Sequence, residues 1–168
     1  IGIWNHLDKP AATVMTSSGD YPVWIGWKIL ERLGDVVANT LSPGAVYIIS
    51  DEGAYKHARS AQVSLEHAGV ETHLFLVPAG ESNKNLEMAR HIYQWLAARR
   101  AERRHLILGV GGGVVGDLAG FVAATYLRGI RFGLIPTTVL AMMDASIGGK
   151  TGVDLPEGKN LVGAFHQP

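Results

Sequence analysis

A glycine-rich connection between two apolar segments constrains this chain more than any other feature. The sequence Gly111-Gly112-Gly113-Val114-Val115-Gly116-Asp117 follows a short apolar run, His105–Gly109, and leads into a longer one, Val114–Leu127. The first run has the length of a strand, and the second is apolar on almost every side, which predicts a buried helix. A strand that turns into a helix through glycines is typical of α/β folds, in which the helix N-terminus can receive an anionic ligand.

The rest of the chain alternates short β-favouring runs with amphipathic segments. Apolar spacing predicts helices over Trp27–Leu41, Ala54–Ala68, Asn83–Ala98 and Thr138–Ile147. Strands are predicted over the apolar run 45–49, which ends at Ser50-Asp51, and over Thr72–Val77 and Arg131–Ile135. Hairpins are predicted for Ala11–Thr16 with Tyr21–Gly26, joined by Ser17-Ser18-Gly19-Asp20, and for the segment from Gly148 onward. We therefore predict an α/β fold: a Rossmann-like, mainly parallel sheet with helices on both faces, plus N-terminal and C-terminal β-hairpin segments.

Composition excludes several classes of function. The 168 residues suit one domain, and 15 basic side chains balance 15 acidic ones, so nucleic acid is not an expected partner. Cysteine is absent, which rules out disulfides and thiolate chemistry in this chain. No apolar run approaches the roughly 20 residues that cross a bilayer, and no signal peptide opens the sequence, so we expect a cytoplasmic protein without a membrane partner.

Both ends of the sequence look cut, because it opens on Ile1 and stops at Pro168 directly after an apolar segment. We therefore expect a piece of a longer protein. Glycine is abundant, at 21 of 168 residues, and 13 of the 21 lie between residues 109 and 168. Glycine is favoured where a backbone bends sharply or approaches a ligand closely. The last third of the chain is therefore the first place to look for a site.

The glycines 111, 113 and 116 fit the G-x-G-x-x-G pattern, which lets a backbone approach a pyrophosphate. An ordinary strand–helix turn without a ligand is the alternative. The pattern usually has an acidic residue about 20 positions downstream to hold a ribose, and none is present here. If a dinucleotide binds, its ribose must be held from elsewhere. Asp51, at the end of an earlier strand, and Glu81, in a later loop, are the candidates.

A second group of polar residues follows the last predicted helix. Gly149-Lys150-Thr151 resembles part of a P-loop, but Asp144 stands where that motif needs glycine, so we reject it. Lys150 and Lys159 are suited to a phosphate, a carboxylate or a developing oxyanion, with Asp144 and Asn160 near them in sequence. Solvated loop charges are the alternative. Arg128, just past the buried helix, is either a helix-end cation or an anion ligand.

Read together, these segments resemble the N-terminal half of the 3-dehydroquinate synthase family. The resemblance is nearly continuous over the last 60 residues or so and includes a separate Gly-Glu-x-x-Lys element at 80–84; before residue 70 it is thinner. The segments that carry it are Gly-Gly-Gly-Val-Val-Gly-Asp-Leu-Ala-Gly (111–120), Tyr-Leu-Arg-Gly (126–129), Pro-Thr-Thr (136–138), Asp-Ala-Ser-Ile-Gly-Gly-Lys-Thr-Gly (144–152) and Gly-Lys-Asn-Leu-Val-Gly-Ala-Phe (158–165).

The resemblance implies that residues 1–168 form an N-terminal domain that binds NAD, and that a C-terminal metal-binding domain is absent from this chain. The implied cofactor residues are Asp51, Gly80, Glu81, Lys84, Gly112, Gly113, Val114, Val115, Gly116, Asp117, Thr137, Thr138, Lys150 and Lys159. The implied catalytic residues are Lys150, Asp144, Asn160 and Arg128, the last reaching a substrate phosphate across a homodimer.

The family's substrate is a small sugar phosphate, 3-deoxy-D-arabino-heptulosonate 7-phosphate. NAD oxidises a ring hydroxyl transiently, phosphate is eliminated, and the product is 3-dehydroquinate of the shikimate pathway. The resemblance also implies a divalent metal, zinc or cobalt, in the full-length enzyme only. No two of the seven histidines flank a glutamate at helical spacing, so the sequence predicts no metal ligand in this chain. We accordingly expect this chain alone to be inactive.

Three other functions remain possible at this stage. A different sugar-phosphate cyclase, making inosose or valiolone, would differ in the substrate loop, but the intact Gly-Lys-Asn at 158–160 favours dehydroquinate synthase. A metal-dependent glycerol or alcohol dehydrogenase tends to carry Asp-x-Ala-Lys after the glycines, whereas this chain has Asp117-Leu118-Ala119-Gly120. An NAD-binding module without catalysis is the third.

Overall fold

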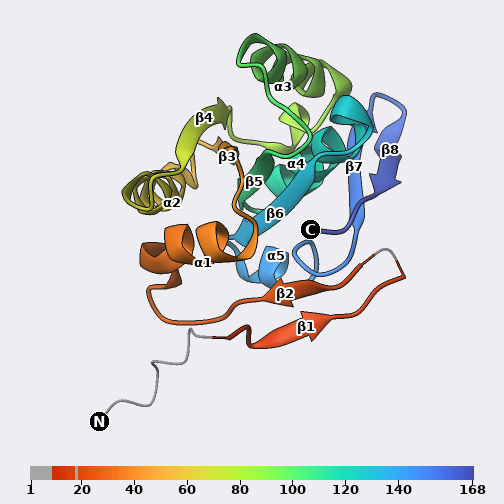
Figure 1. Ribbon diagram of the computed structural model, residues 1–168. Helices are drawn as coiled ribbons and strands as arrows, with labels where there is room; N and C mark the ends of the chain where they lie inside the picture. Colours follow the sequence, from red (N-terminus) through yellow and green to blue (C-terminus); the bar gives the residue numbers. More distant parts are fainter. Residues whose placement is uncertain (1–8, 18) are drawn as a thin grey trace.

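The computed structural model describes residues 9–17 and 19–168, and its centre is a parallel sheet (Figure 1). The strands are β3 (Ala45–Asp51), β4 (Glu71–Val77), β5 (Leu106–Gly111) and β6 (Arg131–Pro136), in the spatial order β4-β3-β5-β6. In the register of β3, Ile48 faces Leu74 on one side and Leu108 on the other. All three pairings are parallel, which confirms the predicted mainly parallel sheet.

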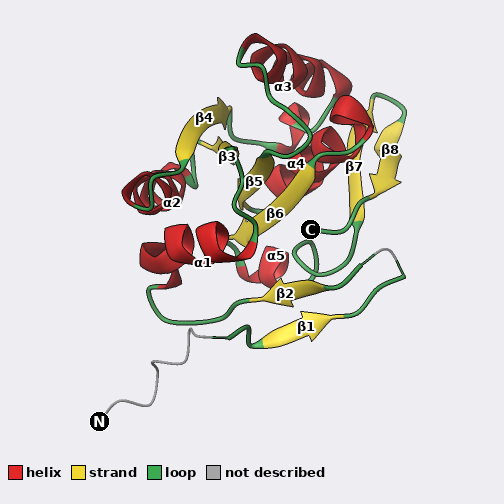
Figure 2. Cartoon of the chain, in the orientation of Figure 1, coloured by secondary structure: helices red, strands yellow, loops and turns green. Residues whose placement is uncertain are grey.

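Four main helices cover the two faces of the sheet (Figure 2). They are α1 (Leu33–Thr40), α2 (Tyr55–His67), α3 (Leu86–Ala98) and α4 (Gly113–Thr125). Short 3₁₀ segments precede α1 and α3 and follow α4, at Ile29–Arg32, Glu81–Asn83 and Tyr126–Arg128. Each long helix predicted from apolar spacing is present, with ends that differ by a few residues.

The alternation of side chains along β3 explains why both faces are covered. Tyr47 and Ile49 belong to the core cluster under α3 and α4, whereas Val46 and Ile48 belong to the cluster under α1 and α2. All four side chains are at most 1% exposed. Full burial of one such apolar side chain contributes roughly 1.5–3 kcal/mol. A strand that buries apolar side chains on both of its faces therefore requires helices on both sides of it.

Two antiparallel hairpins flank the sheet, as predicted. The first pairs β1 (Ala12–Val14) with β2 (Tyr21–Val23), and Ser18, in its predicted connection, lies outside the described residues. The second pairs β7 (Lys150–Leu155) with β8 (Gly158–Phe165). This second hairpin packs on α4: Val153 is fully buried in the core, and a Cβ at Gly120 would lie only 2.4 Å from Thr151 Cγ2.

The predicted helix Thr138–Ile147 is too long. The observed helix, α5 (Val139–Met143), ends at Asp144, whose φ of −132° and ψ of −75° leave the helical region. The chain then turns, because the Ser146 hydroxyl donates to the Met142 carbonyl at 3.2 Å and the Ser146 N–H donates to Ala141 O at 2.9 Å. Serine side chains compete with backbone groups in this way, which shortens helices.

Candidate functional site

The strand order creates one natural crevice at the carboxyl edge of the sheet. The chain passes from β3 to β4 on one side and later to β5 on the other, so the direction of winding changes between β3 and β5. Ligands of open α/β sheets bind at such a switch point, outside the carboxyl ends of the strands. Asp51 ends β3 and Gly111 ends β5, so the structure brings the predicted acid and the glycine connection to this crevice.

A cavity of about 310 Å³ occupies this edge. Its lining residues come from the turns after β3, β5 and β6, and they are Asp51, Gly53, Ala54, His57, Gly112, Thr137 and Thr138. The Asp51 carboxylate is fixed there, because its Oδ1 accepts the Ala54 N–H at 2.8 Å. Its other oxygen, Oδ2, has no hydrogen-bond partner within the described part of the chain. A carboxylate held by one oxygen in a cavity can accept a ligand hydroxyl with the other.

The N-terminus of α4 is open toward the same edge. Gly112 is the N-cap residue, in an extended conformation, and no side chain caps the helix. The first hydrogen bond of the helix runs from the Gly116 N–H to Gly112 O, at 3.0 Å. The N–H groups of the first three helical residues, 113–115, therefore have no acceptor in the helix. A Cβ at Gly113 would meet no atom within 4 Å, so there is room for an anion beside these donors.

The two threonines after β6 pack against the glycine connection. The Thr137 N–H donates to Gly111 O at 2.9 Å, and a Cβ at Gly112 would lie 3.4 Å from Thr138 Cγ2. The Thr138 hydroxyl oxygen accepts the Ala141 N–H at 3.2 Å and so caps α5. A Cβ at 112 would therefore be in ordinary van der Waals contact with Thr138.

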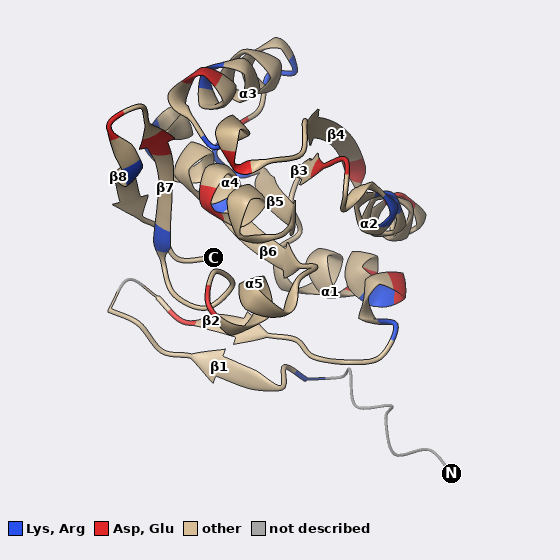
Figure 3. Cartoon of the chain, turned by 180° about the vertical axis from the view of Figure 1, so that it is seen from behind, with Lys and Arg blue, Asp and Glu red and all other residues tan. Residues whose placement is uncertain are grey.

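Away from the residues that line the cavity, the buried ammonium of Lys84 is surrounded by oxygen atoms. Lys84 is only 4% exposed. Its Nζ lies near four oxygens: Asn160 Oδ1 at 2.9 Å, Asp117 Oδ2 at 3.2 Å, Glu81 Oε1 at 3.3 Å and Asp154 Oδ1 at 3.5 Å. We call this group the Lys84 cluster. Figure 3 shows acidic and basic positions close together where the loop before α3 approaches α4 and the β7–β8 hairpin. An ammonium has three N–H donors, so this set of oxygens saturates Lys84.

The loop that carries Lys84 is held by its own side chains. Gly80 has a φ of +117°, which favours glycine. The Asn83 amide donates to Pro78 O at 2.9 Å, and Asn85 Oδ1 caps α3 by accepting the Met88 N–H at 2.8 Å. Lys159, from β8, lies outside this loop and pairs with Glu81 at 3.1 Å. The cofactor residues predicted at 81, 84, 117 and 159 therefore meet in one place.

Burial and charge shift the pKa values within the Lys84 cluster. Burial raises the pKa of Asp117, and the neighbouring Lys84 ammonium opposes this rise without cancelling it. Desolvation by itself would lower the pKa of Lys84, but the carboxylates led by Asp117 outweigh it and raise that pKa. Desolvation also opposes ionisation of Asp154, yet the Asn160 N–H and Lys84 lower its pKa. Lys84 and Asp154 are therefore both charged at neutral pH.

The four predicted catalytic residues do not lie together. Lys150 is exposed at the open end of the β7–β8 hairpin, where it pairs with Phe165, and Asp144 is exposed at the end of α5. Asn160 lies near the closed end of the same hairpin, in the Lys84 cluster. Arg128 is exposed beyond the C-terminal end of α4, about 20 Å along that helix from the glycine connection.

Sequence reasoning missed two residues that the structure places at these sites. Asp154 joins the Lys84 cluster, and His57 lines the cavity beside Asp51. Aspartate is disfavoured in strands, so a carboxylate inside the β-favouring run before Gly158 was a usable signal. His57 gave no such signal, because a histidine near the start of an amphipathic helix is common. Only the folded turn after β3 shows that it lines the cavity.

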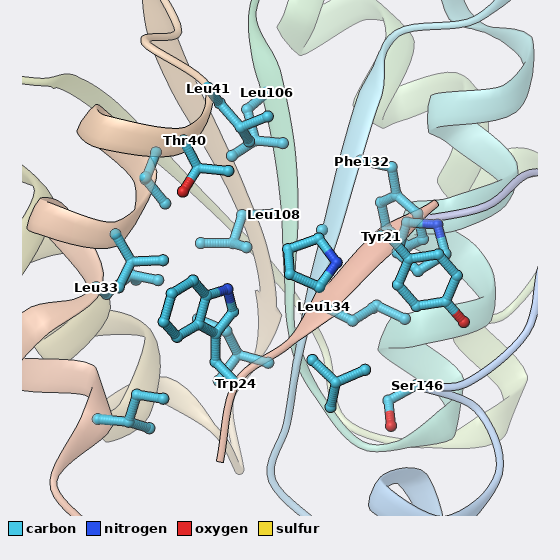
Figure 4. A pocket seen from close by; sticks show the side chains of 18 of the residues that line it. Tyr21, Trp24, Leu33, Thr40, Leu41, Leu106, Leu108, Phe132, Leu134 and Ser146 are labelled. Carbon is cyan, nitrogen blue, oxygen red and sulfur yellow. The ribbon is translucent and has the colours of Figure 1, made fainter. Parts of the chain in front are cut away.

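A larger cavity, of about 350 Å³, lies between α1, β2 and the β5–β6 part of the sheet (Figure 4). Apolar side chains such as Leu33, Leu106, Leu108 and Trp24 point into it. None of the predicted site residues lines this cavity. The size of a cavity therefore does not identify the functional site here, whereas the chemistry at the carboxyl edge does.

Two absences concern the described residues alone. Within 9–17 and 19–168, no group of three His, Cys, Asp or Glu side chains is placed to hold a metal ion. In the same ranges, no helix is long and apolar enough to cross a membrane.

The parallel sheet, with a glycine connection at its switch point, places the chain in the Rossmann-like class of α/β folds. The sequence profile described as 3-dehydroquinate synthase N-terminal matches residues 74–168. The chain belongs to that family. A 3-dehydroquinate synthase of Symbiobacterium thermophilum is 49% identical over 150 residues, which is 88% of this chain and 42% of that protein. The chain thus spans less than half the length of such relatives.

Solved structures of related enzymes share the fold. The crystal structure of a 2-deoxy-scyllo-inosose synthase superposes with a TM-score of 0.85 at 30% identity, covering 94% of this chain and 44% of that one. A structure of such a synthase with carbaglucose-6-phosphate, NAD⁺ and Co²⁺ gives a TM-score of 0.84 at 29% identity, covering 94% of this chain and 43% of the other. These proteins confirm the α/β fold class.

Proposed function

We propose that this chain is the NAD-binding N-terminal domain of a 3-dehydroquinate synthase. The complete enzyme would convert 3-deoxy-D-arabino-heptulosonate 7-phosphate to 3-dehydroquinate and phosphate. The family match supports the reaction, and one structural observation carries the cofactor assignment. That observation is the cavity in which Asp51 and the glycine connection meet beside an uncapped helix N-terminus.

The residues at this edge fit NAD. The free N–H groups at 113–115 suit a pyrophosphate, and the open space beside Gly113 leaves room for it. Asp51 suits a ribose, because a carboxylate accepts from ribose hydroxyls and repels a 2′-phosphate. Thr137 and Thr138 complete the wall of the cavity. When bound, NAD supplies the transient oxidation of a substrate hydroxyl.

Two carboxylates of the Lys84 cluster would help to bind the cofactor. They are Glu81, in the loop before α3, and Asp117, at the start of α4. Because Lys84 is saturated by four oxygens, its role would be to hold these two carboxylates in place. Lys159 neutralises Glu81 from the hairpin side.

Lys150, Asp144 and Asn160 would belong to the substrate side. Lys150 is exposed, so its ammonium is available to a developing negative charge. Arg128 would reach the substrate phosphate of a second copy in a homodimer. Its backbone supports a special role: Leu127 and Arg128 have φ values of +51° and +63°. Such conformations cost about 1–2 kcal/mol per non-glycine residue.

The metal ion expected in the full-length enzyme, zinc or cobalt, would be held outside the residues described here, and no step is assigned to it. A cytoplasmic location and a homodimer are parts of the same proposal. The alternatives are less favoured, because the dehydroquinate synthase of Symbiobacterium thermophilum is 49% identical to this chain, against 29–30% for the two inosose synthase structures. The Asp117–Gly120 sequence also departs from the dehydrogenase pattern.

The decisive test of the reaction uses a longer protein that contains this chain. It should release phosphate from the heptulosonate phosphate in an NAD-dependent manner. Lys150→Met should lower turnover by on the order of 100-fold, with an unchanged melting temperature. This chain alone should bind NAD and release no phosphate. Phosphate release by the chain alone would contradict the proposal that half of the catalytic site lies elsewhere.

A further inference from the structure

Asp154 joins two segments that lie 70 residues apart in the chain. Its N–H donates to Lys84 O at 2.8 Å, and it forms an isolated parallel bridge with Asn85. Its Oδ1 accepts the Asn160 N–H at 2.8 Å and lies 3.5 Å from Lys84 Nζ. The backbone of Asp154 therefore holds the loop before α3, and its side chain holds the start of β8.

These contacts compensate for an irregularity in the hairpin. The pairing of β7 and β8 shifts register between Val153 and Leu155, so Asp154 lies at a bulge. Asn160, on the opposite strand, has a φ of +55°. A residue at a bulge is left out of the regular ladder. The Asp154 carboxylate takes the place of the missing ladder acceptor for the Asn160 N–H.

The bulge also sets where two functional side chains point. Asn160 presents its amide oxygen to Lys84 at 2.9 Å, and Lys159 reaches Glu81 at 3.1 Å. Both follow the turn of the hairpin. Val153 anchors β7 in the core, but the closed end of the hairpin is held by the polar contacts of Asp154.

We propose that Asp154 is a positioning residue, which fixes Lys84, Lys159 and Asn160 relative to one another and so pre-organises the cofactor side of the site. This inference rests on the proposed function, because it assumes that NAD binds beside the Lys84 cluster. Asp154 would not touch the nucleotide. Its effect would pass through the loop before α3 and the start of β8.

Three variants of this chain test the inference. Asp154→Ala removes the charge and the acceptor, whereas Asp154→Asn removes the charge and keeps an oxygen for the Asn160 N–H. Glu157→Gln is the matched control, because it removes an exposed carboxylate from the turn of the same hairpin. NAD affinity is measured by titration calorimetry, and hydrogen exchange of residues 158–162 is measured without NAD.

We expect Asp154→Ala to weaken NAD binding about tenfold and Asp154→Asn about threefold, since a hydrogen bond to a charged group is lost in full or in part. Glu157→Gln should stay within about twofold of the unsubstituted chain. Asp154→Ala should also speed amide exchange at 158–162, while α2 and α4 keep their protection. A purely structural role would instead lower protection throughout the chain.

Two results would overturn the inference. In one, Asp154→Ala and Asp154→Asn bind NAD like the unsubstituted chain, which contradicts the role of Asp154 and leaves the proposed function intact. In the other, the unsubstituted chain itself binds no NAD, which contradicts the proposed function and the Asp154 inference together. If Asp154→Ala fails to fold, Asp154→Asn alone decides between the outcomes.

Discussion

Lys84 Nζ lies 2.9 Å from Asn160 Oδ1, although 76 positions separate these residues in the sequence. The contact joins the loop before α3 to the second strand of the C-terminal hairpin. Asp117, at 3.2 Å from the same ammonium, adds the first turns of α4. One buried lysine thus links three segments that the family resemblance assigns to cofactor and substrate.

Removing the Lys84 ammonium should destabilise the fold. Lys84→Met leaves Asp117 and Asp154 without their cation, whereas Glu81 keeps its pair with Lys159. Loss of one partner from a buried ion pair costs about 3–5 kcal/mol, and partial exposure of the carboxylates reduces this to about 2 kcal/mol. Urea denaturation of the variant and of the unsubstituted chain measures the change in the free energy of unfolding. Lys56→Met, an exposed lysine on α2, is the control and should stay within about 0.5 kcal/mol. Equal effects of the two substitutions would refute the structural importance of the Lys84 cluster.

The contribution of Asp154 to stability should depend on pH. Its pKa is lowered in the folded chain, so its charged form adds stability above the ordinary Asp pKa of about 4, and this stability disappears as pH falls through the lowered value. The difference in unfolding free energy between the unsubstituted chain and Asp154→Asn should therefore shrink between about pH 5 and pH 2. Urea unfolding at a series of pH values measures this. A difference that grows on acidification would contradict the assignment.

Two glycine substitutions should affect different properties, one the NAD affinity and the other the stability of the fold. A Cβ at Gly113 meets nothing within 4 Å, so Gly113→Ala should keep the melting temperature and lower NAD affinity about tenfold by crowding the anion site. A Cβ at Gly120 would lie 2.4 Å from Thr151 Cγ2, so Gly120→Ala should destabilise the chain by about 1–3 kcal/mol. Thermal unfolding and NAD titration on both variants separate the two effects. Unchanged NAD affinity in Gly113→Ala would remove Gly113 from the site.

Asp51 should select NAD over NADP. Asp51→Asn removes the charge that repels a 2′-phosphate, so the ratio of NADP to NAD affinity should rise about tenfold. Glu52→Gln, an exposed neighbour outside the cavity lining, should leave the ratio unchanged. Glu81→Ala separates the two acids that the sequence left open as ribose ligands. If only Glu81→Ala changes the ratio, the ribose lies in the Lys84 cluster and not at Asp51.

The sequence predicted the architecture well because its signals are local. Apolar runs such as 45–49 and the helical spacing of Asn83–Ala98 reflect burial on one or both faces, which a single segment records. The helix predicted over Thr138–Ile147 was wrong at its C-terminal end, where Ser146 bonds backbone carbonyls and Asp144 leaves the helical region. Apolar spacing does not record such side-chain competition.

The sequence identified most residues of the candidate site but not how they are arranged in space. The sequence named Lys84, Asp117, Lys159 and Asn160, but no local signal joined them, because their contacts depend on how the hairpin packs on α4. Asn160 was grouped with Lys150 by proximity along the chain, whereas the hairpin places them near opposite ends. Asp154 was missed for the same reason: its partners come from a loop 70 residues earlier.

The central claim is that NAD binds at the carboxyl edge of the sheet, and backbone-amide NMR spectra of this chain during an NAD titration test it most directly. We predict saturable shifts centred on residues 112–115, Asp51 and Thr137, with smaller shifts in the Lys84 cluster. The amide signals of residues that line the larger apolar cavity, such as Trp24 and Leu108, should not shift. Shifts confined to that apolar cavity, or no saturable shift at any NAD concentration, would contradict the claim.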